Sequence, residues 1–220
     1  MSTSVAAPED VGIEVAEQFA DATQQRHAAQ LGMWAWLLTE LLLFAGLFVC
    51  AAVLHVTHPA AVARAARHLK VWIGAANTAV LICSSLTMTG AITASRHGWR
   101  RWMLRCLLAT AALGTLFLLL KGFEYYQDYL EHMTPFLDRP YALAGEPATR
   151  LYIDLYFLTT ALHALHLTTG VAILLGMTWI ARGRHFLARH QNWIEVYGLY
   201  WHFIDLIWIM VFTLIYVVPR

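Results

Sequence analysis

The stretch that decides the fold is ALHALHLTTGVAILL, residues 161–175, followed after a basic loop by YWHFIDLIWIMVFTLIYVV, residues 200–218. Both runs are dominated by large apolar side chains, and neither contains proline. A helix needs about 20 such residues to cross the roughly 30 Å hydrocarbon core of a bilayer. With their flanking residues, the two runs are long enough, so each predicts a membrane-spanning helix.

The same criterion, applied outward along the chain, predicts five spans at about residues 31–54, 71–94, 103–126, 151–180 and 193–218. Of the 220 residues, 59% are hydrophobic and 13% are charged, which is too apolar for a water-soluble core. Lipid offers no partners to backbone polar groups, and the runs are too long for tilted barrel strands. We therefore predict an all-α, polytopic membrane bundle of five transmembrane helices.

Two parts follow from this division, a polar N-terminal arm at residues 1–30 and a transmembrane domain at residues 31–220. The arm is rich in acidic residues, which is the opposite of a basic and then apolar signal peptide, and we expect it to remain as a solvent-facing segment. Helix-breaking prolines and a glycine in residues 127–150 predict a structured external turn. Three separate cysteines, Cys50, Cys83 and Cys106, are predicted to be small buried hydrophobes.

Basic residues predict the direction of insertion. Those on the side of the N-terminus are Arg26, Arg96, Arg100, Arg101, Arg105, Arg182, Arg184 and Arg189, and those on the opposite side are Arg64, Arg67, Lys70, Arg139, Arg150 and Arg220. The positive-inside rule then places the N-terminus in the cytoplasm and the C-terminus outside. Because the net charge is only +1 and the basic residues are scattered, a nucleic-acid partner is not expected.

Ionisable residues inside spans are costly and mark functional positions by default. In this chain they are Glu40, Lys121, Glu124, Asp154, His163, His166, Glu195, His202 and Asp205. Glu40 lies roughly 13 Å into the first span, at about 1.5 Å per residue, with no cation nearby in the sequence. It is either a proton or lipid site or a structural hydrogen bond to a neighbouring helix. Lys121 and Glu124 are three residues apart and are expected to pair.

His163 and His166 in one span and His202 and Asp205 in the next allow two interpretations. His163 and His202 both lie near the bilayer middle, so a haem could bridge them. We prefer a hydrogen-bonded polar seam of His163, His166, Glu195, His202 and Asp205 that sets helix register. The Glu-x-x-His pairs of a di-iron bundle are absent from the spans, so we predict no metal and no cofactor bound by this chain.

A family resemblance rests on five runs that occur in order. They are LLTELLLFAGLF at 37–48, NTAVLICSSLTMT at 77–89, LGTLFLLLKGFEYY at 113–126, ALHALHLTTGVAILL at 161–175 and YWHFIDLIWIMVFTLIYVV at 200–218. Together they resemble cytochrome c oxidase subunit III, in the five-helix form of many bacterial members that lack the first two helices of the mitochondrial form. The resemblance covers residues 31–218 and leaves the arm outside.

The resemblance implies a non-catalytic subunit of a proton-pumping haem-copper terminal oxidase in the bacterial plasma membrane. Haem and copper would lie in partner subunits I and II, where oxygen is reduced to water, and this chain would stabilise the catalytic subunit, bind phospholipid and support proton uptake. It also implies that Glu40 lies near a lipid-filled cleft and that Arg182 lies near lipid phosphate. Lys121 departs from the family, which often has Gln there.

Three other functions remain open at this stage. The first is subunit III of a quinol oxidase or an accessory subunit of a nitric oxide reductase, either of which would share the fold. In any of these complexes, the chain could also be part of a larger respiratory supercomplex. An independent proton-coupled carrier would need discontinuous helices with midspan breaks, yet no span has a central proline. A haem-binding membrane anchor is the third.

Overall fold

The computed structural model describes residues 18–132, 134, 147–183 and 186–218, without the side chains of residues 22 and 186–191. Its elements are α1 (Ala22–Thr57), α2 (Pro59–His68), α3 (Val71–Arg96), α4 (Arg100–Leu130), α5 (Pro147–Ile180), α6 (Phe186–Val211) and the π-helical η1 (Phe212–Val217). The described residues form no strand, and 5 of the helices are long and apolar enough to cross a membrane. The predicted all-α bundle with five transmembrane helices is thus confirmed.

The first helix begins earlier than the hydropathy of the chain indicates. α1 starts at Ala22, and the side chain of Asp21 caps it by accepting a 2.7 Å hydrogen bond from the Gln24 backbone N–H. Hydropathy locates only the part of a helix that lies in lipid, whereas a capped helix of polar residues continues into water. Residues 22–30 of the predicted arm are therefore helical, and residues 1–17 lie outside the described part.

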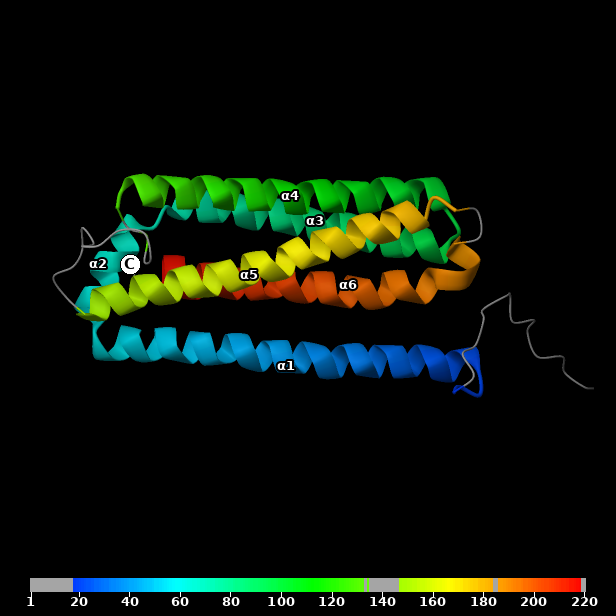
Figure 1. The fold of residues 1–220 in the computed structure, drawn as a ribbon, viewed down its shortest axis with the longest axis horizontal. Helices are drawn as coiled ribbons and strands as arrows, with labels where there is room; N and C mark the ends of the chain where they lie inside the picture. Colours follow the sequence, from blue (N-terminus) through cyan, green and yellow to red (C-terminus); the bar gives the residue numbers. More distant parts are fainter. Residues whose placement is uncertain (1–17, 133, 135–146, 184–185, 219–220) are drawn as a thin grey trace, which may run out of the picture.

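The short helix α2 was not among the sequence predictions. Pro59 occupies its first turn, where a missing N–H costs nothing, and Val62, Ala65 and Ala66 are fully buried. α2 lies across one end of the bundle and packs on α5 (Figure 1). Ten residues are too few to span a bilayer, so a search for spans passes over this helix. The predicted turn after α4 falls mostly on residues 135–146, outside the described part.

The five long helices run roughly parallel to one axis (Figure 1). α3 packs most extensively on α4, α4 also packs on α5, and α6 contacts α3, α5 and α1. The start of α1 and the end of η1 lie at opposite ends of the bundle (Figure 1), as an odd number of crossings requires. The direction of insertion itself stays a prediction.

Glycines allow the central helices to approach closely. A Cβ at Gly114 in α4 would lie 2.9 Å from the side chains of both Trp201 and Val171, and one at Gly198 in α6 would lie 2.5 Å from Ile92. Trp201 is fully buried and donates a 2.9 Å hydrogen bond from its indole nitrogen to Ser84 Oγ. Small residues at helix crossings are typical of membrane bundles, because dispersion contacts between close backbones drive association there.

Much of the bundle's outer surface is apolar. Leu42, Leu86 and Trp179, on three different helices, are each at least 66% exposed, which suits a surface covered by acyl chains. Cys50 and Cys83 are exposed on this surface and Cys106 is half-buried, so the prediction that all three are buried inside the protein was wrong. A bundle in lipid has no need to turn small apolar side chains inward, because both environments are apolar.

Candidate functional site

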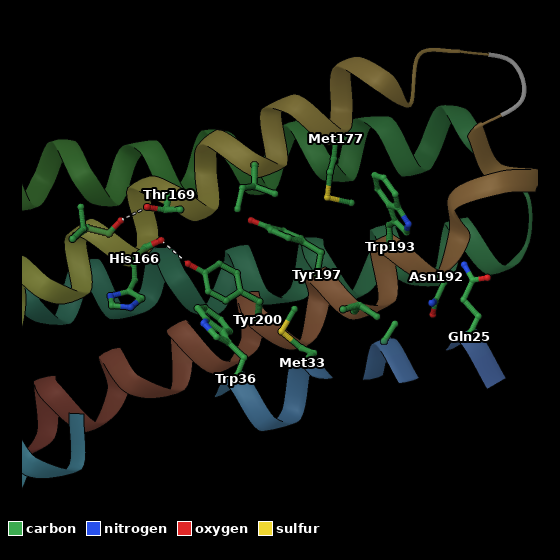
Figure 2. A pocket seen from close by; sticks show the side chains of 14 residues that line it. Gln25, Met33, Trp36, His166, Thr169, Met177, Asn192, Trp193, Tyr197 and Tyr200 are labelled. Carbon is green, nitrogen blue, oxygen red and sulfur yellow. Dashed lines mark hydrogen bonds between the residues drawn. The ribbon is translucent and has the colours of Figure 1, made fainter. Parts of the chain in front are cut away.

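A cavity of about 750 Å³ lies between α1, α5 and α6. Met33 and Trp36 contribute to it from α1, His166 and Met177 from α5, and Trp193 from α6 (Figure 2). Its volume is within the range of about 300–1,000 Å³ that is usual for small-molecule sites. Because its walls are predominantly aromatic and aliphatic, the cavity suits an apolar chain rather than a polar ligand.

Two tyrosines of α6 contribute apolar surface to the cavity although they carry hydroxyl groups. The hydroxyl of Tyr197 donates to the carbonyl of Gly170 at 2.6 Å. That of Tyr200 donates to the carbonyl of His166 at 2.8 Å (Figure 2). Both hydroxyls are thus used to bind α6 to α5. The Tyr200 ring also lies 5.3 Å from the Trp36 ring, which extends the aromatic wall to α1.

Glu40 and His166 form the polar group at this site. His166 Nε2 lies 3.0 Å from Glu40 Oε2, and both side chains are 17% exposed. His166 Nδ1 lies 2.8 Å from the Leu162 carbonyl oxygen, which can only accept, so Nδ1 carries a hydrogen. The contact between Nε2 and the Glu40 carboxyl group therefore requires a hydrogen on one of the two atoms, either on Nε2 or on the carboxyl oxygen. This single hydrogen bond joins α1 to α5.

A second polar cluster is more deeply buried in the protein, where α4 meets α5 and η1. Lys121 Nζ lies 3.0 Å from Glu124 Oε2, 3.1 Å from the Tyr156 hydroxyl and 2.6 Å from the Tyr216 hydroxyl. The Lys121 and Glu124 side chains are only 2% and 1% exposed. Tyr216 in turn donates to Glu124 Oε1 at 2.9 Å. The pair predicted from the sequence is present, and two tyrosines from other elements complete its hydrogen bonding.

The cluster continues towards one end of the bundle. The Tyr156 hydroxyl also lies 3.4 Å from Asp128 Oδ2, and Lys70 Nζ lies 3.5 Å from Asp128 Oδ1 and 3.0 Å from Glu131 Oε1. Lys70 immediately precedes α3, so the chain of contacts links α4, α5 and η1 to the connection before α3. Sequence reasoning missed Asp128 as a member, although positions 121, 124 and 128 share one helix face by their spacing.

The π-helical segment η1 places Tyr216 in this cluster. Single π turns within helices often occur at functional or strained positions. Gly74 in α3 accommodates the segment, since a Cβ there would lie 2.8 Å from the Phe212 ring and 3.3 Å from the Tyr216 ring. No periodicity in the sequence marks a π turn, so the partner of Lys121 could not be identified from spacing alone.

The residues of the predicted polar seam do not share one network. His166 bonds Glu40, Glu195 Oε1 accepts from Arg96 Nε at 2.8 Å, and His202 Nδ1 lies 2.7 Å from Ser85 Oγ. His163 is 1% exposed between the Phe117 and Trp208 rings, and neither of its ring nitrogens has a hydrogen-bond partner within the described residues. His163, His166 and Glu195 therefore have different neighbours, whereas His202 and Asp205 lie beside the same groove with Ser85. Their predicted joint role in helix register stays a prediction.

Arg182 lies just past the end of α5, with its guanidinium 5.2 Å from the centre of the Trp179 ring. Its backbone carbonyl accepts a hydrogen bond from Arg100. Its side chain is exposed and does not line the cavity. Across the described ranges, no group of three His, Cys, Asp or Glu side chains has the geometry of a metal site.

Relatives among known proteins match most of this chain. The chain is 29% identical over 191 residues to "Cytochrome c oxidase subunit 3" of Thermostichus vulcanus, covering 86% of this chain and 87% of that protein. It is 28% identical over 186 residues to the protein of the same name from Synechocystis sp., covering 84% and 73%. It is also 33% identical over 140 residues to that of Loxodonta africana, covering 64% and 48%.

The match to the Loxodonta protein covers about half of that protein, whereas the two cyanobacterial relatives align over most of their length. The model of the family "Cytochrome c oxidase subunit III" matches residues 1–219. With the five-helix bundle, this match establishes that the chain belongs to the cytochrome c oxidase subunit III family.

Proposed function

We propose that this chain is the non-catalytic third subunit of a proton-pumping haem-copper oxidase in a bacterial plasma membrane, with cytochrome c as the electron donor. The family match over residues 1–219 is the observation that carries the proposal. In this arrangement subunits I and II hold the haem and copper and reduce oxygen, with the N-terminus of this chain in the cytoplasm. The chain stabilises the catalytic subunit and supports proton uptake.

The cavity between α1, α5 and α6 supports a role in holding phospholipid. Its aromatic walls suit an acyl chain, and the tyrosine hydroxyls that could have made it polar are bonded to α5 carbonyls. Arg182, exposed just past the end of α5, offers a guanidinium to a lipid phosphate. The lipid would thus occupy the cavity between α1, α5 and α6.

The Glu40–His166 pair supports a role in proton exchange beside the bound lipid. Because the pair shares one proton and is 17% exposed on each side, it can exchange that proton without breaking the link between α1 and α5. A mobile proton close to the lipid is what a supporting role in proton uptake requires. The alternative, a purely structural bond between two helices, uses the same contact but needs no exchange.

The test of Glu40 uses the assembled oxidase. Glu40→Gln and Glu40→Ala are compared with Leu42→Ala, whose side chain is 66% exposed on the same helix. Three quantities are measured: the number of turnovers before inactivation, the protons pumped per electron, and the phospholipid retained on purification. We expect at least one of them to fall in both Glu40 variants and none to change in the control. If all three are unchanged, Glu40 has only a structural role.

Purification of the native complex distinguishes the possible oxidases. We expect a partner subunit II with a copper-binding soluble domain, as in a cytochrome c oxidase. A complex without that domain would indicate a quinol oxidase, and a nitric oxide reductase core would indicate an accessory subunit of that enzyme. Activity of the chain alone in liposomes would instead support an independent carrier, and mass spectrometry of the complex would show whether it belongs to a supercomplex.

A further inference from the structure

The carboxyl group of Asp205 is a buried polar group that the proposed function leaves unexplained and that borders a surface groove. Its side chain is on α6, and the residue is only 5% exposed. Neither carboxyl oxygen has a hydrogen-bond partner within the described residues. A buried carboxyl group without a partner is strongly unfavourable, and more so in hydrocarbon, where no water competes for it. Its position therefore points to a partner from outside this chain.

Asp205 lines a groove between α3 and α6. The groove has a volume of about 280 Å³, and Ser85 and His202 contribute its other polar groups. Its remaining lining includes Leu86 and Leu206, which are 68% and 54% exposed on the outer surface of the bundle. The carboxyl group is thus reached from the lipid-facing side between two exposed apolar side chains.

The polar neighbours of Asp205 do not satisfy it. The Ser85 hydroxyl lies near the carboxyl group and interacts with it, but its 2.7 Å hydrogen bond is with His202 Nδ1. A hydroxyl has a single proton to donate, so Ser85 can serve at most one of the two carboxyl oxygens, and only when His202 Nδ1 donates to Ser85. The groove therefore presents acceptor oxygens and needs a donor.

The depth of Asp205 restricts where that donor can come from. The span containing it runs from Asn192 to Val217, so Asp205 is roughly 20 Å from one end and roughly 18 Å from the other at about 1.5 Å per residue. Lipid headgroups lie at the ends of the span, and acyl chains carry no donor. A soluble protein does not reach this depth. Donors that do are side chains on another membrane-spanning helix and water trapped in the groove.

We propose that the groove between α3 and α6 receives a membrane-spanning helix of another oxidase subunit, which donates a hydrogen bond to Asp205 from an N–H or O–H group near its midpoint. This proposal rests on the proposed function only in that the partner belongs to the same complex. The exposed leucines at the rim supply apolar contact, and the single directional bond sets the register of the two helices, as interhelical hydrogen bonds do in membranes. The face between α3 and α6 is thereby the docking face.

The first test uses a photoreactive amino acid in the full oxidase, in native membranes. It is placed at Leu206 or Leu86 on the rim of the groove, and at Leu119 as the control, because Leu119 is 66% exposed on α4 away from the groove. We expect both rim positions to cross-link to another subunit, which mass spectrometry identifies, and Leu119 to cross-link to lipid. Cross-links from the rim to lipid alone, in a complex that still contains this chain, would overturn the docking face and leave the proposed function intact.

The second test changes the hydrogen bond. Asp205→Asn retains an acceptor oxygen of similar size, whereas Asp205→Leu removes it. We expect Asp205→Leu to weaken retention of the chain in the purified oxidase by between about threefold and about twentyfold, the range that interhelical hydrogen bonds span in membranes. Asp205→Asn is expected to stay near wild type, and the amount of each variant in membranes is the folding control.

These experiments distinguish failure of the docking inference from failure of the proposed function. If Asp205→Leu is present in membranes and is retained like wild type, water rather than a partner helix satisfies the carboxyl group and the inference is overturned. If the Leu variant is not found in membranes, the cross-links made with unaltered Asp205 still decide the docking face. A wild-type chain that never purifies with an oxidase contradicts the proposed function itself.

Discussion

Two regions of the bundle each contain a basic and an acidic side chain 3.0 Å apart, yet their surroundings differ. Lys121 and Glu124 are 2% and 1% exposed and are bonded to Tyr156 and Tyr216, whereas Glu40 and His166 are each 17% exposed beside a cavity. The first pair is enclosed by its own chain. The second borders a cavity between three helices, so the distance within a pair says less about its role than the neighbours of the pair do.

The energetic consequences of that difference follow from desolvation. Removing charges from water is costly, and the cost is offset only where the geometry is good and the remaining hydrogen bonds are made. The Lys121 cluster meets both conditions through the two tyrosine hydroxyls. The Glu40–His166 pair keeps partial exposure and can be neutral, because one proton is shared between the two groups. We therefore expect substitutions to affect stability in the cluster and function at the cavity.

The largest loss of stability is expected for Lys121→Met. The change leaves the Glu124 carboxylate buried without its cation, and breaking a buried pair in this way costs about 3–5 kcal/mol. The measurement is unfolding of the purified chain in mixed micelles titrated with a denaturing detergent. The matched control is Lys121→Met with Glu124→Leu, which removes both members and is expected to recover much of the loss. Equal stability of the single variant and wild type would show that the cluster does not stabilise the fold.

A smaller loss of stability is expected for a larger side chain at a tight contact between helices. Gly114 faces Trp201 and Val171 in the dense part of the bundle, whereas a Cβ at Gly46 in α1 would meet nothing within 4 Å. Gly114→Val is expected to lose about 1–3 kcal/mol by overpacking, with Gly46→Val as the control near wild type. The same detergent titration applies. A similar loss in both variants would contradict the contrast between dense and open regions.

Tyr216→Phe tests the contribution of η1 to the cluster. Loss of the hydroxyl removes its bonds to Lys121 and Glu124, and hydrogen bonds in membrane bundles average about 0.6 kcal/mol with a maximum of about 1.7 kcal/mol. We expect a loss within that range. Tyr126→Phe, at a residue that is 59% exposed on α4, is the control. If the two variants unfold at the same detergent concentration, the π-helical segment does not stabilise the cluster.

The smallest effect on stability is expected for Glu40→Gln. With a hydrogen on Nδ1, neutral His166 can accept at Nε2 from the glutamine amide, so the link between α1 and α5 remains. The expected change in the free energy of unfolding is below about 1 kcal/mol, while turnover lifetime, pumping or lipid retention changes as proposed above. A stability loss as large as that of Lys121→Met would show that the pair is a structural element like the cluster.

The sequence predicted the spans because hydropathy over about 20 residues depends only on local composition. It also predicted the Lys121–Glu124 contact, since residues three apart on a helix are neighbours whatever surrounds them. It did not predict α2, which is too short to span, or the start of α1 at Ala22, because hydropathy does not report helix that continues into water.

The partners of the buried groups needed the tertiary structure. Residues 40 and 166, or 121 and 216, are brought together by how the helices are arranged, and no local spacing encodes that arrangement. This is why the sequence could not divide the predicted seam: His166 bonds Glu40 and Glu195 bonds Arg96, whereas His202 and Asp205 lie beside one groove.

By itself, then, the sequence determined that this protein is a bundle of five membrane-spanning helices of the subunit III family, because apolar runs and their order along the chain are local properties. The tertiary structure decided which polar groups are satisfied within the chain and which are not. That distinction depends on rotation of each helix about its axis and on contacts between residues far apart in sequence. It separates the enclosed Lys121 cluster from Glu40 at the cavity and from Asp205 at the proposed docking face.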